Sequence, residues 1–214
     1  MLLSMSTKVR ANAANTEENR LRILDAAAYC FMASGYEATT IDSIAKRIGS
    51  TKGRIYYSYP SKAALLIGVM QEGMQRAEDA VRSAAIGHAE PLARLEAMVG
   101  AHALLVMQAL SYHVVTMDGL ERWRRRAMTA SQRSAVTAIL RQRDRYEEMF
   151  TQVIAEGVAQ QVFRTLDPAL TTRALLGALN STALWYRPRH GQSTTDLATL
   201  ANNIISITLH GIVA

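Results

Sequence analysis

The sequence predicts an all-α protein with a small N-terminal unit of three helices and a larger helical unit behind it. Apolar residues recur at intervals of three and four along most of the chain, which is the spacing of one helix face. Capping residues, glycines and prolines interrupt this pattern where helices are expected to begin and end. With 214 residues, of which 49% are hydrophobic, the chain is long enough for a buried core shared by both units.

The segment from Thr39 to Leu66 has the outline of a helix-turn-helix. Thr40 is a suitable N-cap, since its hydroxyl can accept a hydrogen bond from an unpaired amide of the first turn. Gly49 follows the last apolar residue, where a glycine ends a helix with little strain, and a second helix follows from about 51 to 59. One stripe of the first helix carries Ile41, Ile44, Ala45 and Ile48.

The second helix of this pair leaves polar groups on its surface. Ile55 is its one strongly apolar aliphatic residue and is expected to face the first helix. Gly53 costs about 1 kcal/mol of helix propensity relative to alanine, so we expect another molecule, such as a sugar-phosphate strand, to come close here. The remaining surface would present Lys52, Gly53, Arg54, Tyr56 and Tyr57.

These residues resemble the N-terminal signature of TetR-type transcriptional repressors, in which the second helix enters the major groove of DNA. The matching positions are Gly35-Tyr36, Thr39-Thr40, Ile44-Ala45, Ile48-Gly49, Lys52-Gly53, Ile55-Tyr56-Tyr57 and Ser61-Lys62. The resemblance implies that Thr51, Lys52 and Arg54 contact base edges or the adjacent backbone, beside Gly53. Phosphates would be held by Thr40, Tyr56, Tyr57 and Lys62. Ser58 and Tyr59 stand where histidine and phenylalanine are usual, and Tyr59 is expected to fill the core.

The charge distribution favours an anionic partner such as double-stranded DNA. The chain carries 24 basic and 18 acidic residues, a net charge of +6, and the first 62 residues account for +4 of it. The start, MLLSMSTKVR, has no apolar stretch long enough for a secretory signal, and no segment approaches the roughly 20 apolar residues of a membrane span. We therefore expect a cytoplasmic protein with no membrane contact.

The pattern divides the chain into three parts. Residues 1–16 are expected to form a flexible N-terminal arm, 17–62 the helix-turn-helix DNA-binding domain, and 63–214 an effector-binding and dimerisation domain. A first helix from 17 to 34 would brace the reading helix and end at Gly35. A fourth helix, from 61 to about 85, would join the two domains.

The middle of the chain predicts two further helices with polar residues in their seams. Pro91 can begin one of them, and His102 lies on its buried stripe, as a satisfied core histidine or as a ligand contact. Thr129 with Gln132 can cap the other. Arg143 and Tyr146 interrupt its apolar stripe, so Arg143 must be paired, at the edge of the seam, or facing a ligand. The residues predicted to contact an effector are His102, Met107, Arg143, Tyr146 and Trp185.

Between these helices lies an arginine-rich segment, residues 122–126, with four arginines in five positions. Asp118 and Glu121 have the spacing of a capping box for a short helix that would contain it. Such a cluster forms a solvated face, or binds an anionic effector, or contacts the acidic surface of a partner.

The C-terminal part predicts two helices that pair with a second copy of the chain. Asp167 and Pro168 can start one that runs to about Tyr186, and Ser193 with Asp196 can open the last. The apolar stripe of the last helix is too broad for one buried face, which favours a four-helix seam in a homodimer. The residues expected there are Leu175, Ala178, Thr182, Trp185, Leu200, Ile204, Ile205 and Thr208.

The segment from Val162 to Ser193 resembles a TetR subgroup associated with lipid and sterol catabolism. This resemblance implies a fatty acyl-CoA or a related lipid-like effector. We therefore predict a homodimeric repressor that a small apolar or acyl-CoA-like effector releases from a palindromic operator. A transcriptional activator and a sequence-tolerant DNA-binding protein are alternatives within DNA binding.

A helical small-molecule enzyme is the alternative from another class, and the sequence supports it poorly. The five histidines lack metal-ligand spacing, and the chain has no Gly-rich phosphate loop or nucleophile elbow. We expect no catalytic residues, no metal and no cofactor.

Overall fold

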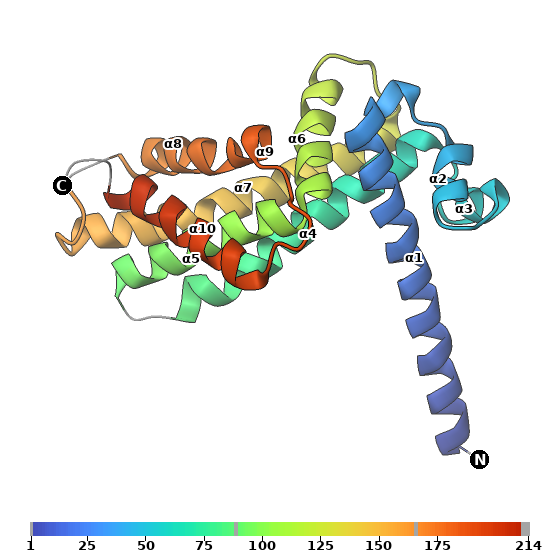
Figure 1. Cartoon of the computed structure of the whole chain (residues 1–214), viewed down its shortest axis with the longest axis horizontal. Helices are drawn as coiled ribbons and strands as arrows, with labels where there is room; N and C mark the ends of the chain where they lie inside the picture. Colours follow the sequence, from blue (N-terminus) through green and yellow to red (C-terminus); the bar gives the residue numbers. More distant parts are fainter. Residues whose placement is uncertain (1, 88–89, 165–166, 211–214) are drawn as a thin grey trace.

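A computed structural model describes residues 2–87, 90–164 and 167–210, and within these residues every regular element is helical (Figure 1). The all-α prediction is confirmed. The helices are α1 (Leu2–Ala38), α2 (Ile41–Arg47), α3 (Lys52–Ser58), α4 (Lys62–Gly87), α5 (Pro91–Gln108), α6 (Leu110–Arg124), α7 (Ala130–Ala159), α8 (Pro168–Asn180), α9 (Thr182–Trp185) and α10 (Thr194–Ile205), followed by the π-helical turn η1 (Ser206–His210).

The first three helices form a small unit at one end of the molecule, and α4 runs from it into the larger unit (Figure 1). Leu24 of α1, Ile44 of α2 and Ile55 of α3 are fully buried together. The Thr40 hydroxyl accepts from the Ser43 amide at 3.1 Å in a capping box, and Gly49 turns the chain with a φ of 63°. The predicted helix-turn-helix is therefore present at the predicted positions.

Helix α1 is longer than the sequence predicts. It begins at Leu2, whereas we expected a helix only from residue 17, and its N-terminal half extends away from the body of the molecule (Figure 1). Gly35 breaks the regular helix with a φ of 75°, as expected, and one further turn ends at Ala38. The expected flexibility of residues 1–16 stays a prediction.

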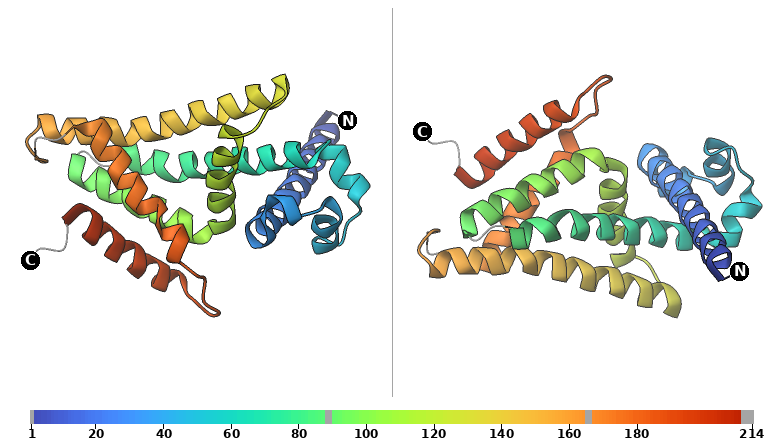
Figure 2. Two further views of the ribbon diagram at one scale, coloured as in Figure 1. Left: turned by 90° about the horizontal axis from the view of Figure 1, so that it is seen from above. Right: turned by 90° about the horizontal axis from the view of Figure 1, so that it is seen from below.

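The larger unit packs α5 and α7 against α4, with α8 on α7 and α10 on α5 (Figures 1 and 2). The predicted starts of α5, α7, α8 and α10 are confirmed: Pro91 occupies the first turn of α5, and the caps are Thr129, Asp167 and Ser193. These signals are local in sequence, because a cap needs only its own first turn.

Two expectations about helix boundaries were wrong. Asp118 lies inside α6, since that helix already starts at Leu110, and the predicted capping box there is absent. The helix expected from 168 to 186 is interrupted at Ser181, which separates α8 from α9. Of the described helices, none by itself is long and apolar enough to cross a membrane; α5 and α6 reach that length only as a pair bent by 94°.

Candidate DNA-reading surface and effector cavity

Helix α3 presents polar side chains to solvent at the end of the molecule. Ile55 is its one buried residue and anchors it to the core of the small unit. Tyr57 is 93% exposed and Tyr56 46% exposed, and beside Gly53 the nearest atom to a built Cβ is the Thr51 hydroxyl at 4.0 Å. The other exposed residues of α3 and its N-cap are Thr51, Lys52, Gly53, Arg54 and Ser58. The space around the helix therefore suits the close approach of a large partner.

Lys62, predicted to hold a phosphate, is occupied within the protein. Its Nζ donates to the carbonyl oxygens of Tyr36, Glu37 and Thr39 at 2.8, 3.1 and 2.9 Å. An ammonium group has three donors, so all of them satisfy the carbonyls at the end of α1. We revise Lys62 from a phosphate contact to a C-terminal cap of α1. Tyr59 is half-buried and packs against the core, as expected.

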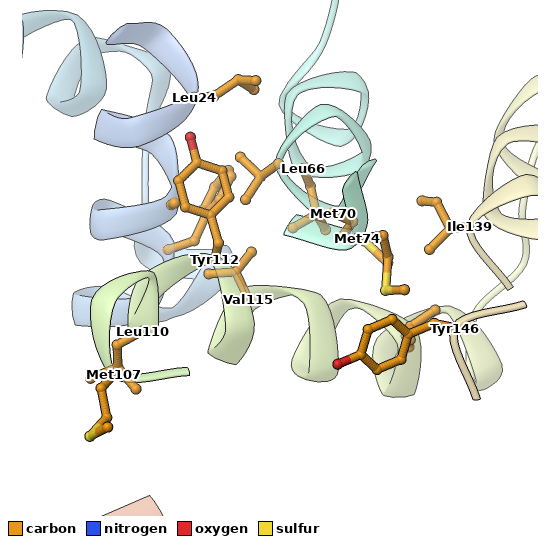
Figure 3. Close-up of a cluster of buried hydrophobic side chains, with 14 of the residues drawn as sticks. Leu24, Leu66, Met70, Met74, Met107, Leu110, Tyr112, Val115, Ile139 and Tyr146 are labelled. Carbon is orange, nitrogen blue, oxygen red and sulfur yellow. The ribbon is translucent and has the colours of Figure 1, made fainter. Parts of the chain in front are cut away.

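A cavity of about 170 Å³ lies between α4, α5, α6, α7 and α8. Three of the five residues predicted to contact an effector, His102, Arg143 and Tyr146, line it. Met107 is buried in the core away from the lining (Figure 3), and Trp185 is 53% exposed on the surface. The other lining residues are Gly73, Met74, Ala77, Leu105, Ala109, Tyr112, His113, Thr116, Met117, Leu120, Glu147, Leu176 and Asn180.

His102 joins three helices through hydrogen bonds. Its Nε2 lies 3.0 Å from Oδ1 of Asn180, and its Nδ1 lies 2.5 Å from the hydroxyl of Tyr146. Since the amide oxygen can only accept, Nε2 donates to it and Nδ1 accepts from Tyr146. Burial lowers the pKa of His102 to about 3 and raises the pKa of Tyr146, so both side chains are neutral at pH 7. Its hydrogen bonds are satisfied within the protein.

Three other buried polar atoms of residues that line the cavity have no hydrogen-bond partner. Two of them, Nε2 of His113 and Oγ1 of Thr116, lie on α6, and the third is Nε of Arg143, which lies 3.4 Å from Glu147. Thr116 is 5% exposed, and burial lowers the pKa of His113 to about 4. Gly73 of α4 lies directly against Thr116, because a Cβ built there would be 2.5 Å from Oγ1. Unpaired buried polar atoms are costly, and both His113 and Thr116 line the cavity.

Arg143 is paired and lies at the edge of the cavity. Its guanidinium group is 3.1 Å from Asp144 and 3.4 Å from Glu147, and its side chain is 42% exposed. Two of the alternatives left open by the sequence, pairing and an edge position, are met together.

The cavity wall is connected to the DNA-binding unit through Tyr112 of α6. Its hydroxyl donates to Oδ1 of Asp25 on α1 at 2.7 Å. Arg76 of α4 lies over the Tyr112 ring, 4.1 Å from its centroid, and pairs with Asp25 at 3.3 Å. Figure 3 shows Tyr112 and Val115 in one cluster with Leu24 of α1 and Leu66 of α4. One residue thus contacts both the cavity and the first helix of the DNA-binding unit.

The arginine-rich segment makes a second connection to α1. Arg122 and Arg126 pair with Glu37 at 2.7 and 2.8 Å, and Arg122 also lies over the ring of Tyr36, 4.1 Å from its centroid. Arg124 and Arg125 pair instead with Glu121 on their own helix. Half of the cluster therefore holds α6 against the end of α1, a role that sequence reasoning missed because Glu37 is distant in sequence.

Three of the residues predicted for the dimer interface are buried within the subunit: Leu175, Thr182 and Ile204 are 7%, 1% and 9% exposed. Leu200, Ile205 and Thr208 are partly buried, and only Ala178 and Trp185 are exposed. The broad stripe of α10 is explained in part by its packing on α5. The exposed residues of α8 and α9, with Ser181 between them, are Ala169, Leu170, Arg173, Ala174, Gly177, Ala178, Ser181, Leu184 and Trp185.

Among the described residues, no group of three or more His, Cys, Asp or Glu side chains is placed to hold a metal ion. The site that these observations define is a surface helix with the features of a DNA reader, connected through α1, α4 and α6 to an internal cavity. Ligand-responsive transcriptional regulators have this arrangement of parts.

Comparison with known proteins agrees. Residues 88–212 match the family described as "Tetracyclin repressor-like, C-terminal domain", and residues 23–69 match "Bacterial regulatory proteins, tetR family". The chain belongs to the TetR family of transcriptional regulators.

Relatives extend over most of the chain. The transcriptional repressor KstR2 of Rhodococcus jostii is 26% identical over 194 residues, which cover 90% of each chain. SrpR of Pseudomonas putida is 41% identical, but over 61 residues that span only 29% of that regulator.

Solved structures share the fold. The regulator PfmR of Thermus thermophilus is 28% identical with a TM-score of 0.75, covering 90% of this chain and all of that one. AibR in complex with isovaleryl coenzyme A and operator DNA is 26% identical with a TM-score of 0.70, covering 88% of this chain and 96% of that one. The ketosteroid regulator KstR2 of Mycobacterium tuberculosis is 25% identical with a TM-score of 0.77, covering 92% and 95%.

Proposed function

We propose that this protein is a homodimeric repressor that a small apolar or acyl-CoA-like effector releases from a palindromic operator. The observation that carries the proposal is Tyr112, which is one of the residues that line the cavity and whose hydroxyl donates a hydrogen bond to Asp25 on α1. A ligand that changes the position of Tyr112 also changes the position of the DNA-binding unit.

In this proposal α3 enters the major groove. Arg54, Lys52 and Thr51 are placed to reach base edges or the adjacent backbone, and Gly53 lets a strand come close. Tyr56, Tyr57 and Thr40 are exposed beside them and would contact phosphates. Lys62 acts indirectly, by holding the end of α1. Access to chromosomal DNA implies a cytoplasmic location for this role.

Two copies would pair through the exposed face of α8, α9 and α10. The small residues Ala174, Gly177, Ala178 and Ser181 allow a neighbouring helix to approach closely. Leu184 and Trp185, 77% and 53% exposed, lie at the end of the same face. The two α3 helices would then be related by a twofold axis, which matches a palindromic operator.

An acyl thioester effector is supported by the complex of AibR with isovaleryl coenzyme A and operator DNA, because that regulator shares the fold of this chain. The cavity here lies at the centre of the corresponding helical domain. In this proposal the protein exchanges between two states that differ in the position of α6. The ligand releases the operator only if it binds the state that cannot bind DNA more tightly than the other state.

The alternative of activation has one observation in its favour. FasR of Mycolicibacterium smegmatis, named a transcriptional activator, is 34% identical over 92 residues. A reporter gene behind the bound operator separates the two, since deletion of the regulator raises expression under a repressor and lowers it under an activator.

The test of the proposed function is a gel shift with the DNA upstream of the gene, titrated with acyl-CoA thioesters. We expect a discrete complex of two chains per duplex, and release of the DNA by at least one thioester. A complex that no thioester dissociates would contradict the proposed effector class.

A further inference from the structure

The volume and the lining of the cavity limit the size and the charge of the ligand that it can accept. Its volume is about 170 Å³. An engineered protein cavity of about 150 Å³ holds one benzene molecule. A group of roughly six to eight non-hydrogen atoms therefore fills this cavity, whereas a sterol ring system or a long acyl chain does not fit inside it.

The polar atoms of the lining specify how such a group is held. Oγ1 of Thr116 and Nε2 of His113 are buried without a partner on the same helix, and both residues line the cavity. His102 in contrast is satisfied by Asn180 and Tyr146. A ligand with one hydrogen-bonding atom at this end satisfies groups that the folded protein leaves unpaired.

The lining also disfavours a charged ligand. Both histidines are neutral because burial lowers their pKa values to about 3 and 4. Arg143 forms ion pairs with Asp144 and Glu147, so its charge is already compensated, although its Nε makes no hydrogen bond. An anion placed in the cavity would lose its hydration without gaining an unpaired cation.

We infer that the cavity binds a short, neutral group with a single hydrogen-bonding atom, which Thr116 and His113 recognise. The group is either a free alcohol or ketone, or the acyl end of a thioester whose remainder stays outside the cavity. This inference rests on the proposed function and narrows its ligand.

Binding is tested on the full chain without DNA, by NMR titration of three probes of similar size: benzyl alcohol, toluene and benzoate. We expect benzyl alcohol to bind more tightly than toluene, and benzoate not to bind. Butanoyl-CoA and hexadecanoyl-CoA, with coenzyme A as the control, distinguish the acyl end of a thioester from a free small molecule. Butanoyl-CoA should bind more tightly than hexadecanoyl-CoA if the thioester is the source; if neither thioester binds, a free molecule is the source.

The variant Thr116→Val keeps the shape of the side chain and removes the hydroxyl. It should weaken benzyl alcohol binding at least fivefold and leave toluene binding unchanged. Thr137→Val, at a partly exposed position on α7 outside the cavity lining, is the matched control and should change neither. Thermal unfolding of both variants shows that they are folded, and a Thr116→Ser variant, which keeps the hydroxyl, should bind benzyl alcohol like the parent.

The inference is overturned if benzoate binds more tightly than benzyl alcohol, if hexadecanoyl-CoA binds more tightly than butanoyl-CoA, if Thr116→Val leaves benzyl alcohol binding unchanged, or if no neutral probe binds. Operator release is measured separately by gel shift. A long-chain thioester that releases the operator would overturn this ligand class and leave the proposed repressor intact. Loss of operator binding itself would contradict the proposed function.

Discussion

The reading helix and the cavity differ in where their polar groups lie and in how far apart in sequence those groups are. Helix α3 carries its polar groups outward on seven residues, with one buried anchor, Ile55. The cavity draws its polar groups from four helices and buries them. Exposed polar groups need no partner in the free protein, whereas buried ones need a hydrogen bond or a ligand. The first surface can therefore be recognised locally, and the second only after folding.

The largest expected effect is a loss of stability at low pH, and it comes from the two histidines that line the cavity. Unfolded histidine has a pKa of about 6.5, whereas the pKa values of His102 and His113 are lowered to about 3 and 4 in the folded protein. The unfolded chain therefore binds more protons below pH 6.5, so their contribution to stability is complete above that pH and is lost as pH falls toward 3. At pH 5 the loss is about 2 kcal/mol for each histidine.

Thermal unfolding at pH 7.5, 6 and 5 measures this loss. The variant His102→Gln, which can still hydrogen-bond, should remove about half of the slope between pH 6.5 and 5. An unchanged slope in the variant would mean that His102 is not held neutral by the fold.

The next largest expected effect is a loss of operator affinity when a side chain of the reading helix α3 is removed. Arg54→Ala should weaken operator binding by about 1–3 kcal/mol if the side chain reads a base, with the free energy of unfolding unchanged because the residue is exposed. Fluorescence anisotropy on operator and scrambled duplexes measures it. Arg141→Ala, exposed on α7, is the control, and equal effects of the two substitutions would remove Arg54 from the site.

Substitutions at Lys62 and Lys52 distinguish a role in stability from a role in DNA contact. Lys62→Met removes the three hydrogen bonds that its ammonium donates to the end of α1, and should lower the free energy of unfolding by about 2 kcal/mol. Urea unfolding measures this change. Lys52→Met, exposed on α3 with a weak pairing to Asp42 at 3.8 Å, should leave stability unchanged and lower the salt dependence of DNA binding. If Lys62→Met instead is stable and alters only the salt dependence, the phosphate role first predicted for it is right.

The smallest effect tests the connection between the two regions. Tyr112→Phe removes the hydrogen bond to Asp25 and leaves the rest of this cavity-lining residue in place. One such bond is worth about 1 kcal/mol, so the coupling between effector and operator should fall about fivefold while effector binding without DNA stays the same. The coupling is the ratio of operator affinities with and without effector. Full coupling in the variant would assign signal transmission elsewhere, for example to Arg122, Arg126 and Glu37.

The sequence predicted the fold well, and the reason is the local character of its signals. The caps at Thr40, Thr129, Asp167 and Ser193 each depend on the next three residues, and the stripe spacing defines the helices. His102, Arg143 and Tyr146 were predicted to contact an effector because a polar residue on a buried apolar stripe requires a hydrogen-bond or charge partner. All three line the cavity.

What sequence reasoning missed depends on contacts between distant parts of the chain. Tyr112 and Asp25 are 87 positions apart, and nothing in either segment indicates the other. In the sequence, Thr116 and His113 have no feature that distinguishes them, and only the fold leaves them buried without partners. Leu175, Thr182 and Ile204 were expected at the dimer surface, and an apolar stripe alone does not show which of its residues the subunit itself buries.

The central claim is that two subunits of a dimer each bind one half-site of the operator with helix α3. It is tested most directly by incubating the purified protein with a library of random DNA duplexes, recovering the bound molecules and sequencing them. We predict enrichment of a palindrome whose two half-sites are separated by one or two helical turns, with two chains bound per duplex. Recovery of no enriched sequence, or of a single half-site bound by one chain, would contradict the account.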